Sequence, residues 1–270
     1  MRFGRLELLE TKRVAARYLK RYILSSDNHE FVGRIYDLSI VSLHFDSYEE
    51  LSKHPDCKYA YDVYYVLSML TRRVESLNMV GGMIWPTKMP KNFKEFPVSR
   101  YEWLTISADV FLARYISVMD CATILVNEVM ECGLSSQACT LQNLKKQPVP
   151  KSVLRHLEKM IEDQGLLRKE RNRRFHHGHE REFSSDDEMF RIGALFEHRY
   201  NGARGPNGRA LPVERLFREG LVELQKEFNR VMRKVVKQLN GLYDMLYSEF
   251  ENRFSPRFRA GAFARKSARA

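Results

Sequence analysis

The chain has 270 residues, of which 44% are hydrophobic, so it can bury the core of one large domain or two small ones. Its formal net charge of +11 favours an anionic partner such as nucleic acid, a nucleotide or an acidic surface. The four cysteines form no CxxC pair and no zinc-finger spacing with histidine, which argues against a disulfide scaffold or zinc finger and predicts reduced thiols.

The sequence predicts a protein without a membrane partner. Charged residues interrupt every apolar run at the N-terminus, so this end does not look like a signal peptide. The most apolar segment, Trp103–Cys132, includes charged residues such as Asp109 and Arg114, whereas a membrane helix needs roughly 20 mostly uncharged residues. We therefore expect a soluble, cytoplasmic protein.

The first 99 residues predict a mainly helical extension or cap. Leu6–Leu24 repeats apolar residues at three- and four-residue steps and is predicted to be a helix. Val32–Phe45 fits both a short helix and one or two β-segments. Tyr59–Leu77 is predicted to be a helix whose many tyrosines pack in the core, with base stacking as the alternative.

A long loop is expected before residue 100. The pair Gly81–Gly82 should begin it, and three prolines keep the following residues irregular up to Ser99. We expect aromatic residues within this loop, Trp85 and Phe93 among them, to attach it to the body of the protein.

The pattern from Arg100 onward predicts a helical bundle. Arg100–Cys132 is expected to be one amphipathic helix that Gly133 ends. Ser152–Gln164 is expected to be a short helix ending at Gly165, followed by a separate basic helix.

Two further helices are predicted near the C-terminus. Ser184–Asp187 supplies side chains that can cap a helix running to about Tyr200. After a flexible loop at residues 202–212, Val213–Phe250 is predicted to be the longest helix, followed by a basic disordered tail. The predicted organisation is an N-terminal extension at 1–99, a bundle at 100–250 and a tail at 251–270.

The sequence ERNRRFHHGH, Glu170–His179, concentrates basic side chains and three histidines, and Arg168 lies just upstream. Arginine binds phosphate as a flat, permanently charged fork. Histidine, with an unperturbed pKa of ~6.5, can exchange a proton near neutral pH. We therefore expect an RNA-cutting or RNA-binding site here; the alternative is a solvated basic helix surface.

The helical spacing of this stretch limits which side chains can meet. Each helical residue turns ~100°, so Asn172 and His176 share a face, whereas Arg171 lies ~140° from His176. Arg171 and His176 could converge if the helix is irregular near His177–Gly178, or if a second subunit supplies one of them. Asn172 could bind one imidazole nitrogen and leave the other for proton transfer.

A metal site is a further hypothesis for the same stretch, with His176, His177, His179 and Glu180 as its ligands. His176 and Glu180 can share a helix face, but His177 cannot join them unless the helix bends. We therefore expect no metal ligands and no cofactor.

Arg171, Asn172 and His176 resemble the signature of the HEPN superfamily (higher eukaryotes and prokaryotes nucleotide-binding). That signature is an Arg followed after four to six residues by a His, with a polar residue usually next to the Arg. His177 fits the five-residue spacing. The flanking sequences ISADVFLARYISVMDCATILVNEVMECGL and FHHGHEREFSSDDEMFRIGALFE are similar to a bacterial branch of the superfamily, and the resemblance covers roughly residues 100–250.

The resemblance implies an all-α, HEPN-like bundle that forms a homodimer and cleaves RNA without a metal, often in antiphage defence or a toxin–antitoxin system. Arg171 would bind the phosphate, Asn172 would orient the imidazole ring, and His176 or His177 would transfer a proton. The surrounding side chains expected to bind RNA are Arg168, Arg173, Arg174 and His179. An antitoxin or another defence protein is an expected partner. The alternative is a non-catalytic HEPN-like module that binds RNA or nucleotides, or acts in assembly.

Overall fold

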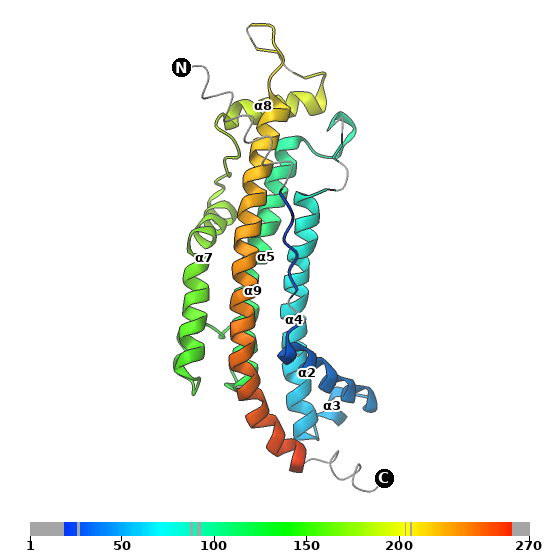
Figure 1. The fold of residues 1–270 in the computed structure, drawn as a ribbon, viewed down its shortest axis with the longest axis vertical. Coiled ribbons are helices and arrows are strands. Elements are labelled where there is room, and N and C mark those ends of the chain that lie inside the picture. The colour runs from blue at the N-terminus through cyan, green and yellow to red at the C-terminus, as the bar shows by residue number, and fades with distance from the viewer. Residues whose placement is uncertain are drawn as a thin grey trace. The chain divides into compact units, whose positions relative to one another are not determined.

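The computed structural model describes residues 19–25, 28–86, 89–90, 93–202, 204–205 and 207–260. Over these residues the fold is all-α, which confirms the predicted class; outside the helices there is an isolated β-bridge between Arg204 and Ala210. Figure 1 shows the elements in chain order: α2 (Glu30–Ser39), η1 (Ile40–His44), α3 (Tyr48–Leu51), α4 (Pro55–Ile84), η2 (Phe93–Glu95), α5 (Arg100–Val129), α6 (Leu141–Leu144), α7 (Lys151–His177), α8 (Asp187–Arg199) and α9 (Val213–Ala260).

The described residues form two compact units. Unit 1 comprises the described residues of 19–23, 77–113 and 167–233, and unit 2 those of 24–76, 114–166 and 234–260. Helices α4, α5, α7 and α9 each contribute one segment to each unit. The units therefore combine segments that are distant in the sequence, and their boundaries do not coincide with the predicted divisions at residues 99 and 250.

Unit 1 is centred on aromatic contacts between its helices. Phe228 of α9 is fully buried, and its ring centroid lies 5.5 Å from that of Phe111 on α5 and 5.5 Å from that of Trp85. Phe93 is also buried, 5.8 Å from the ring of Phe217. The aromatic residues of the proline-rich loop thus attach it to the body, as predicted.

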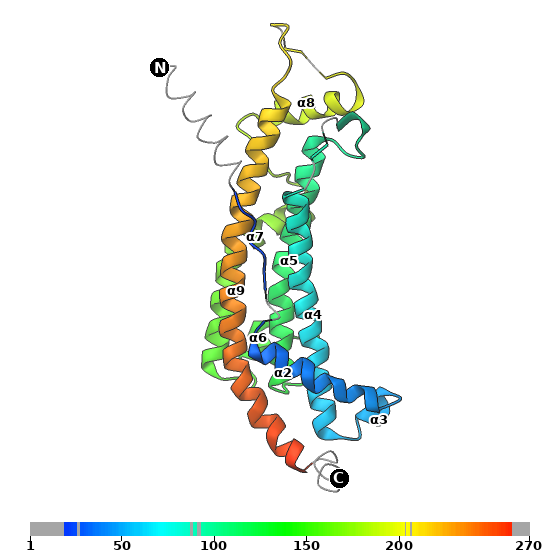
Figure 2. The same ribbon diagram turned by 45° about the vertical axis from the view of Figure 1, so that its right-hand side comes forward.

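The segment 19–25 contains no helix, so the predicted helix Leu6–Leu24 is wrong at its end; residues 6–18 lie outside the described residues. The part in unit 1 lies beside α9, as Figure 2 shows. The carboxamide of Asn229 accepts from the backbone N–H of Tyr22 at 2.7 Å and donates to the carbonyl of Lys20 at 2.9 Å. These bonds satisfy backbone groups that an extended segment leaves unpaired.

The ambiguous segment 32–45 is helical, since α2 and η1 together cover residues 30–44. The side chain of His29 caps α2 by accepting from the backbone N–H of Phe31 at 3.2 Å. Phe31, Val32 and Ile35 form the buried face of α2 in unit 2, at helical rather than strand spacing.

Helix α4 continues through Gly81–Gly82 to Ile84, so the prediction that this pair begins a loop is wrong. The guanidinium of Arg21 donates to the carbonyl of Asn78 and lies against Gly81, where an added Cβ would stand 2.6 Å from its Nε. The glycine at position 81 leaves room for the Arg21 guanidinium, and its presence does not mark the end of the helix.

Helix α7 likewise continues through Gly165, which was predicted to end it, as far as His177. Glycine in a helix interior costs only ~1 kcal/mol relative to alanine, and packing can exceed that cost. The buried positions Leu157, Met160, Gln164 and Leu167 recur at three- and four-residue steps across the glycine. The unbroken spacing of buried residues is therefore a stronger signal for this helix than the single glycine is against it. The basic stretch is the end of a 27-residue helix.

Helix α9 extends to Ala260, so the predicted disordered tail is wrong for residues 251–260; residues 261–270 lie outside the described part of the chain. Phe254 is buried in unit 2 and stacks on Phe250, with 5.3 Å between ring centroids. Phe250 in turn stacks on Tyr59 of α4 at 5.2 Å. This core packing keeps α9 helical beyond the predicted end, even though Pro256 lies within it.

Several helix boundaries agree with prediction. Helix α5 ends at Val129, shortly before Gly133, which has a φ of +68°. Asp186 caps α8 by accepting from the backbone N–H of Met189. In the tyrosine-rich α4, the buried Tyr59 hydroxyl donates to a backbone carbonyl at 2.7 Å, which confirms core packing for this residue.

Candidate functional site

The predicted site lies on the last turns of α7, in unit 1. The helix stays α-helical through His177, and Gly178 follows with a φ of +65°. The backbone N–H of His179 then donates to the carbonyl of Arg173 at 3.3 Å. The motif residues from Arg171 to His177 therefore all stand on one regular helix.

This regularity decides which motif residues meet in one copy of the chain. Asn172 and His176 are four residues apart and share a face, as predicted. Arg171 and His176 project ~140° apart, because no irregularity before His177 turns them together. The convergence that an irregular helix would allow is therefore absent within one copy of the chain.

The motif side chains are accessible to solvent. Those that are exposed are Asn172, Arg173, His176, His177 and His179, while Arg171 is half-buried. None of these six makes a side-chain hydrogen bond or ion pair with another residue that the structure describes. They are available to an external anion. Arg168, also predicted to bind RNA, is half-buried and interacts within the protein.

Arg174 differs from its neighbours. Its side chain is only 5% exposed and forms an ion pair with Asp109 of α5 at 2.7 Å and with Glu170 at 3.5 Å. Glu170 also lies 3.5 Å from Arg181, which pairs with Glu227 of α9 at 2.7 Å. Arg174 thus links α7 to the core of unit 1, and we do not include it in the surface available to RNA.

Phe175 is a surface residue that sequence reasoning missed. Its side chain is 53% exposed, and it stands four residues after Arg171 on the same side of the helix. An exposed aromatic ring beside cationic side chains can stack on a nucleic-acid base. The sequence did not signal this exposure, because Phe175 stands about five full turns after the buried Leu157 and continues the buried face by spacing.

The end of a helix also restricts where a phosphate can bind. His176 and His177 stand in the last turn of α7, where the helix dipole favours cations and disfavours anions. A phosphate bound near this end therefore depends on cationic side chains, such as that of Arg171, rather than on the backbone groups of the helix terminus. Helix N-termini, with their free N–H groups, have the opposite preference.

Among the residues that the structure describes, no group of three or more His, Cys, Asp or Glu side chains is placed to hold a metal ion. This includes the predicted but unfavoured set of His176, His177, His179 and Glu180.

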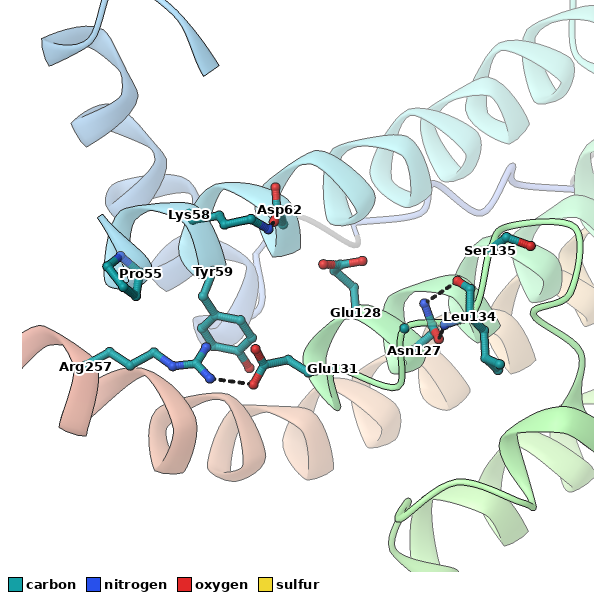
Figure 3. A pocket seen from close by; sticks show the side chains of 11 residues that line it. Pro55, Lys58, Tyr59, Asp62, Asn127, Glu128, Glu131, Leu134, Ser135 and Arg257 are labelled. Atoms are coloured by element: carbon teal, nitrogen blue, oxygen red, sulfur yellow. Dashed lines mark hydrogen bonds and ion pairs between the residues drawn. The ribbon is translucent and has the colours of Figure 1, made fainter. Parts of the chain in front are cut away.

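Unit 2 contains a separate open pocket of about 630 Å³, shown in Figure 3. Lys58 and Asp62 of α4 form an ion pair at 2.5 Å in its wall. Arg257 and Glu131 form another at 2.6 Å. Glu128, at the end of α5, makes no side-chain hydrogen bond or ion pair with a described residue. The pocket therefore carries one carboxylate that is not neutralised by a direct partner.

Burial raises the pKa of Glu128, and the nearby carboxylate of Asp62 raises it further. Lys58 opposes this rise, and Glu131 adds the smallest contribution to it. A raised carboxyl pKa means that the folded protein binds this proton more tightly than the unfolded chain does. The carboxylate therefore destabilises the fold increasingly as pH rises from the unfolded pKa through the folded one.

Glu128→Gln should accordingly raise the Tm at neutral pH, because it removes a charge that the fold disfavours. The gain should disappear as pH falls below the ordinary range of carboxyl groups, where Glu128 is protonated in both states. Thermal unfolding followed by circular dichroism at several pH values measures this. Glu162→Gln, at an exposed position of α7, is the matched control. A lower Tm for Glu128→Gln at neutral pH would contradict the interpretation.

Within the described ranges, no helix combines the length and apolarity that a membrane crossing requires. Comparison of the chain with family models, with curated proteins and with solved structures gives no match.

Proposed function

We propose that this chain is a metal-independent endoribonuclease of the HEPN type, with its active site at the C-terminal end of α7. The observation that carries the proposal is the accessible group formed by Arg171, Asn172 and His176, whose side chains have no partner among the described residues. Arg174, three residues after Arg171, differs from this group because its guanidinium pairs with Asp109 within the fold.

The chemistry requires only groups present in this stretch and in RNA. A histidine accepts the proton of the RNA 2′-hydroxyl, and the oxygen attacks the adjacent phosphorus. The bond to the 5′-oxygen breaks, and this leaving group takes a proton from a second histidine of this stretch, which acts as the acid. The products are a 2′,3′-cyclic phosphate and a 5′-hydroxyl. Arg171 binds the phosphate and stabilises the negative charge that builds up in the transition state.

The proposed active site is composite. Arg171 and His176 project in different directions from one helix, so each site takes Arg171 from one copy and His176 from the other. A twofold axis then produces two equivalent sites per homodimer. Asn172, on the same face as His176, orients the imidazole ring through one of its nitrogens.

The direct test is incubation of the purified protein with mixed RNA in EDTA, followed by analysis of the cut ends. Cleavage that leaves cyclic-phosphate ends and is lost in Arg171→Ala would support the proposal. Cleavage that survives this change and His176→Ala would indicate another site or a contaminant, and would contradict it.

Phe175→Ala should weaken binding of single-stranded RNA by ~1–3 kcal/mol, the range measured for a base stacked on an aromatic side chain. Fluorescence anisotropy with a 2′-O-methyl RNA, which lacks the attacking hydroxyl and is not cut, measures the affinity. Tyr65→Ala, at a tyrosine 58% exposed in unit 2, is the control. Equal affinity of wild type and Phe175→Ala would remove Phe175 from the proposed surface.

A second candidate function is RNA binding without cleavage. The divergence of Arg171 and His176 within one copy favours it, because binding does not require the two to meet. This function predicts that affinity falls with salt, in proportion to the phosphates neutralised, while the RNA stays intact. Salt-sensitive binding without cleavage in the EDTA assay would select it over the nuclease.

The proposed biological setting is antiphage defence or a toxin–antitoxin system, with an antitoxin or another defence protein as partner. If the nuclease acts on cellular RNA, its expression should slow growth, and Arg171→Ala or His176→Ala should restore growth. Growth curves of cells that produce each protein at equal levels measure this. Equal toxicity of the wild type and both variants would contradict the proposal.

A further inference from the structure

Four tyrosines from three helices of unit 2 bring their rings together. Tyr36 belongs to α2, Tyr48 to α3, and Tyr61 and Tyr64 to α4. The ring centroid of Tyr64 lies 5.2 Å from that of Tyr36 and 6.0 Å from that of Tyr61. Tyr61 in turn lies 5.8 Å from Tyr48. Figures 1 and 2 both show α2 and α3 beside the first part of α4. These four residues are called the tyrosine row below.

The tyrosine row is partly open to solvent and is held in place. Tyr36 is 38% exposed and Tyr48 is 50% exposed, and the other two rings are half-buried. The Tyr36 hydroxyl forms a hydrogen bond with the hydroxyl of Thr71 at 2.9 Å, and the Tyr48 hydroxyl donates to Asp62 at 2.8 Å. A tyrosine has only two side-chain torsions, so rings that are already held in place lose little entropy when a partner binds.

The surface around the tyrosine row is acidic, although the chain as a whole carries a net charge of +11. Residues 30–65 contain seven acidic side chains and three basic ones, and two of the basic ones, Arg34 and Lys58, are in ion pairs. Asp37 and Glu49 each follow a tyrosine of the row in the sequence. Their carboxylates are exposed and make no hydrogen bond or ion pair with a described residue. Negative charge without a direct partner therefore accompanies the exposed rings.

This combination of rings and carboxylates disfavours one partner and fits another. Negative charge repels the phosphates of RNA, so these rings are not suited to base stacking. A guanidinium is attracted both to the face of a tyrosine ring and to a carboxylate. Unit 2 itself contains such an arrangement, since the guanidinium of Arg257 lies 4.6 Å from the ring centroid of Tyr59 and also pairs with Glu131.

We propose that the tyrosine row binds an arginine-rich segment of a partner protein. Arginines of that segment lie over the exposed rings and pair with the carboxylates of Asp37 and Glu49. Because several rings follow one another, the row accepts more than one arginine, and its ligand is a segment rather than a single side chain. The inference does not depend on the proposed ribonuclease activity, since the row includes none of the motif residues of α7.

The first experiment measures, by fluorescence anisotropy, the binding of a labelled peptide of alternating arginine and glycine to the full chain. The same peptide with glutamine in place of arginine is the control ligand. The arginine peptide should bind, less tightly as salt rises, and the glutamine peptide should bind at least about tenfold more weakly. The chain is strongly basic overall, so nonspecific charge attraction does not favour this binding.

Variants of the two more exposed rings test the contact itself. Tyr36→Leu combined with Tyr48→Leu should weaken binding of the arginine peptide about 4- to 25-fold, the product of two exposed cation–π contacts of about two- to fivefold each. Tyr36→Phe combined with Tyr48→Phe keeps both rings and should leave the affinity within about twofold of wild type. Circular dichroism verifies that each variant is folded.

A charge variant tests the acidic side chains. Glu49→Lys should weaken binding of the arginine peptide at least about threefold at low salt, and the difference should shrink at high salt. Glu162→Lys, at an exposed position of α7, changes the net charge by the same amount and is the matched control. Its affinity should stay close to that of wild type.

Failure of the arginine peptide to bind would overturn the proposal. Equal binding of the glutamine peptide would do the same and would indicate a surface for neutral peptides. Equal losses in the leucine and phenylalanine variants, or in Glu49→Lys and Glu162→Lys, would also contradict it. These measurements use no RNA, so their outcome and that of the cleavage assay are independent.

Discussion

Arg171→Ala and His176→Ala should each lower the rate of RNA cleavage by about 10²–10⁴-fold, as expected for loss of a proton-transfer group or of a charge that stabilises the transition state. An equal mixture of the two inactive variants should then recover part of the activity. If each site takes Arg171 from one copy and His176 from the other, a mixed dimer keeps one intact site and has one site that lacks both residues.

Half of the dimers in an equilibrated mixture are mixed, and half of their sites are intact, so about a quarter of wild-type activity should return. Initial rates on a labelled RNA in EDTA, measured after the subunits have exchanged, test this. The control is wild type mixed with the Arg171→Ala/His176→Ala double variant. Its mixed dimers contain no intact site, so only dimers of two wild-type copies should cut RNA. Absence of any recovery in a mixture with proven subunit exchange would contradict a composite site.

The fold could be predicted well where a helix boundary has a local chemical cause. The cap at Asp186 and the turn at Gly133 are each set by a few neighbouring residues, and both were placed correctly. Gly81 and Gly165 misled the prediction, because the cost of glycine in a helix is small compared with the packing of the surrounding turns. Contacts such as that between Arg21 and Gly81 join residues distant in the sequence, so local patterns do not reveal them.

The candidate site could likewise be predicted only in part, because spacing along one helix is local whereas packing between helices is not. The side chains of Asn172 and His176 were expected on one face, and a regular helix places them there. Arg173 and Arg174 are neighbours of the same type in the sequence, yet one is exposed and the other is buried against Asp109. Only the packing of α7 on α5 distinguishes them. The exposure of Phe175 likewise depends on how α7 packs near its end, because its helical spacing from Leu157 and Gln164 matches that of buried residues.

Arg174→Ala should destabilise the protein strongly, in contrast to substitution of its exposed neighbour. The change removes a side chain that is only 5% exposed, and the carboxylates of Asp109 and Glu170 lose their ion pairs with its guanidinium. We expect the free energy of unfolding to fall by about 2–3 kcal/mol, less than for a fully buried pair because Asp109 is 35% exposed. Arg173→Ala should change stability by less than about 0.5 kcal/mol, while it weakens RNA binding.

The pH dependence separates lost charge pairing from lost packing. Burial already raises the pKa of Asp109, and Arg174 opposes that rise, so Arg174→Ala should raise this pKa further. In Arg174→Ala, the charged form of Asp109 then destabilises the fold above its folded pKa. This part of the loss in unfolding free energy should vanish once pH falls below the pKa of the same carboxyl group in the unfolded chain. Urea unfolding at neutral and acidic pH measures both parts. Replacing both partners, as in Arg174→Met with Asp109→Leu, should recover stability at neutral pH, because the Asp109 charge is removed with that of Arg174 and Glu170 keeps Arg181. Equal loss for Arg174→Ala and Arg173→Ala would show that the ion pair with Asp109 does not hold α7 in place.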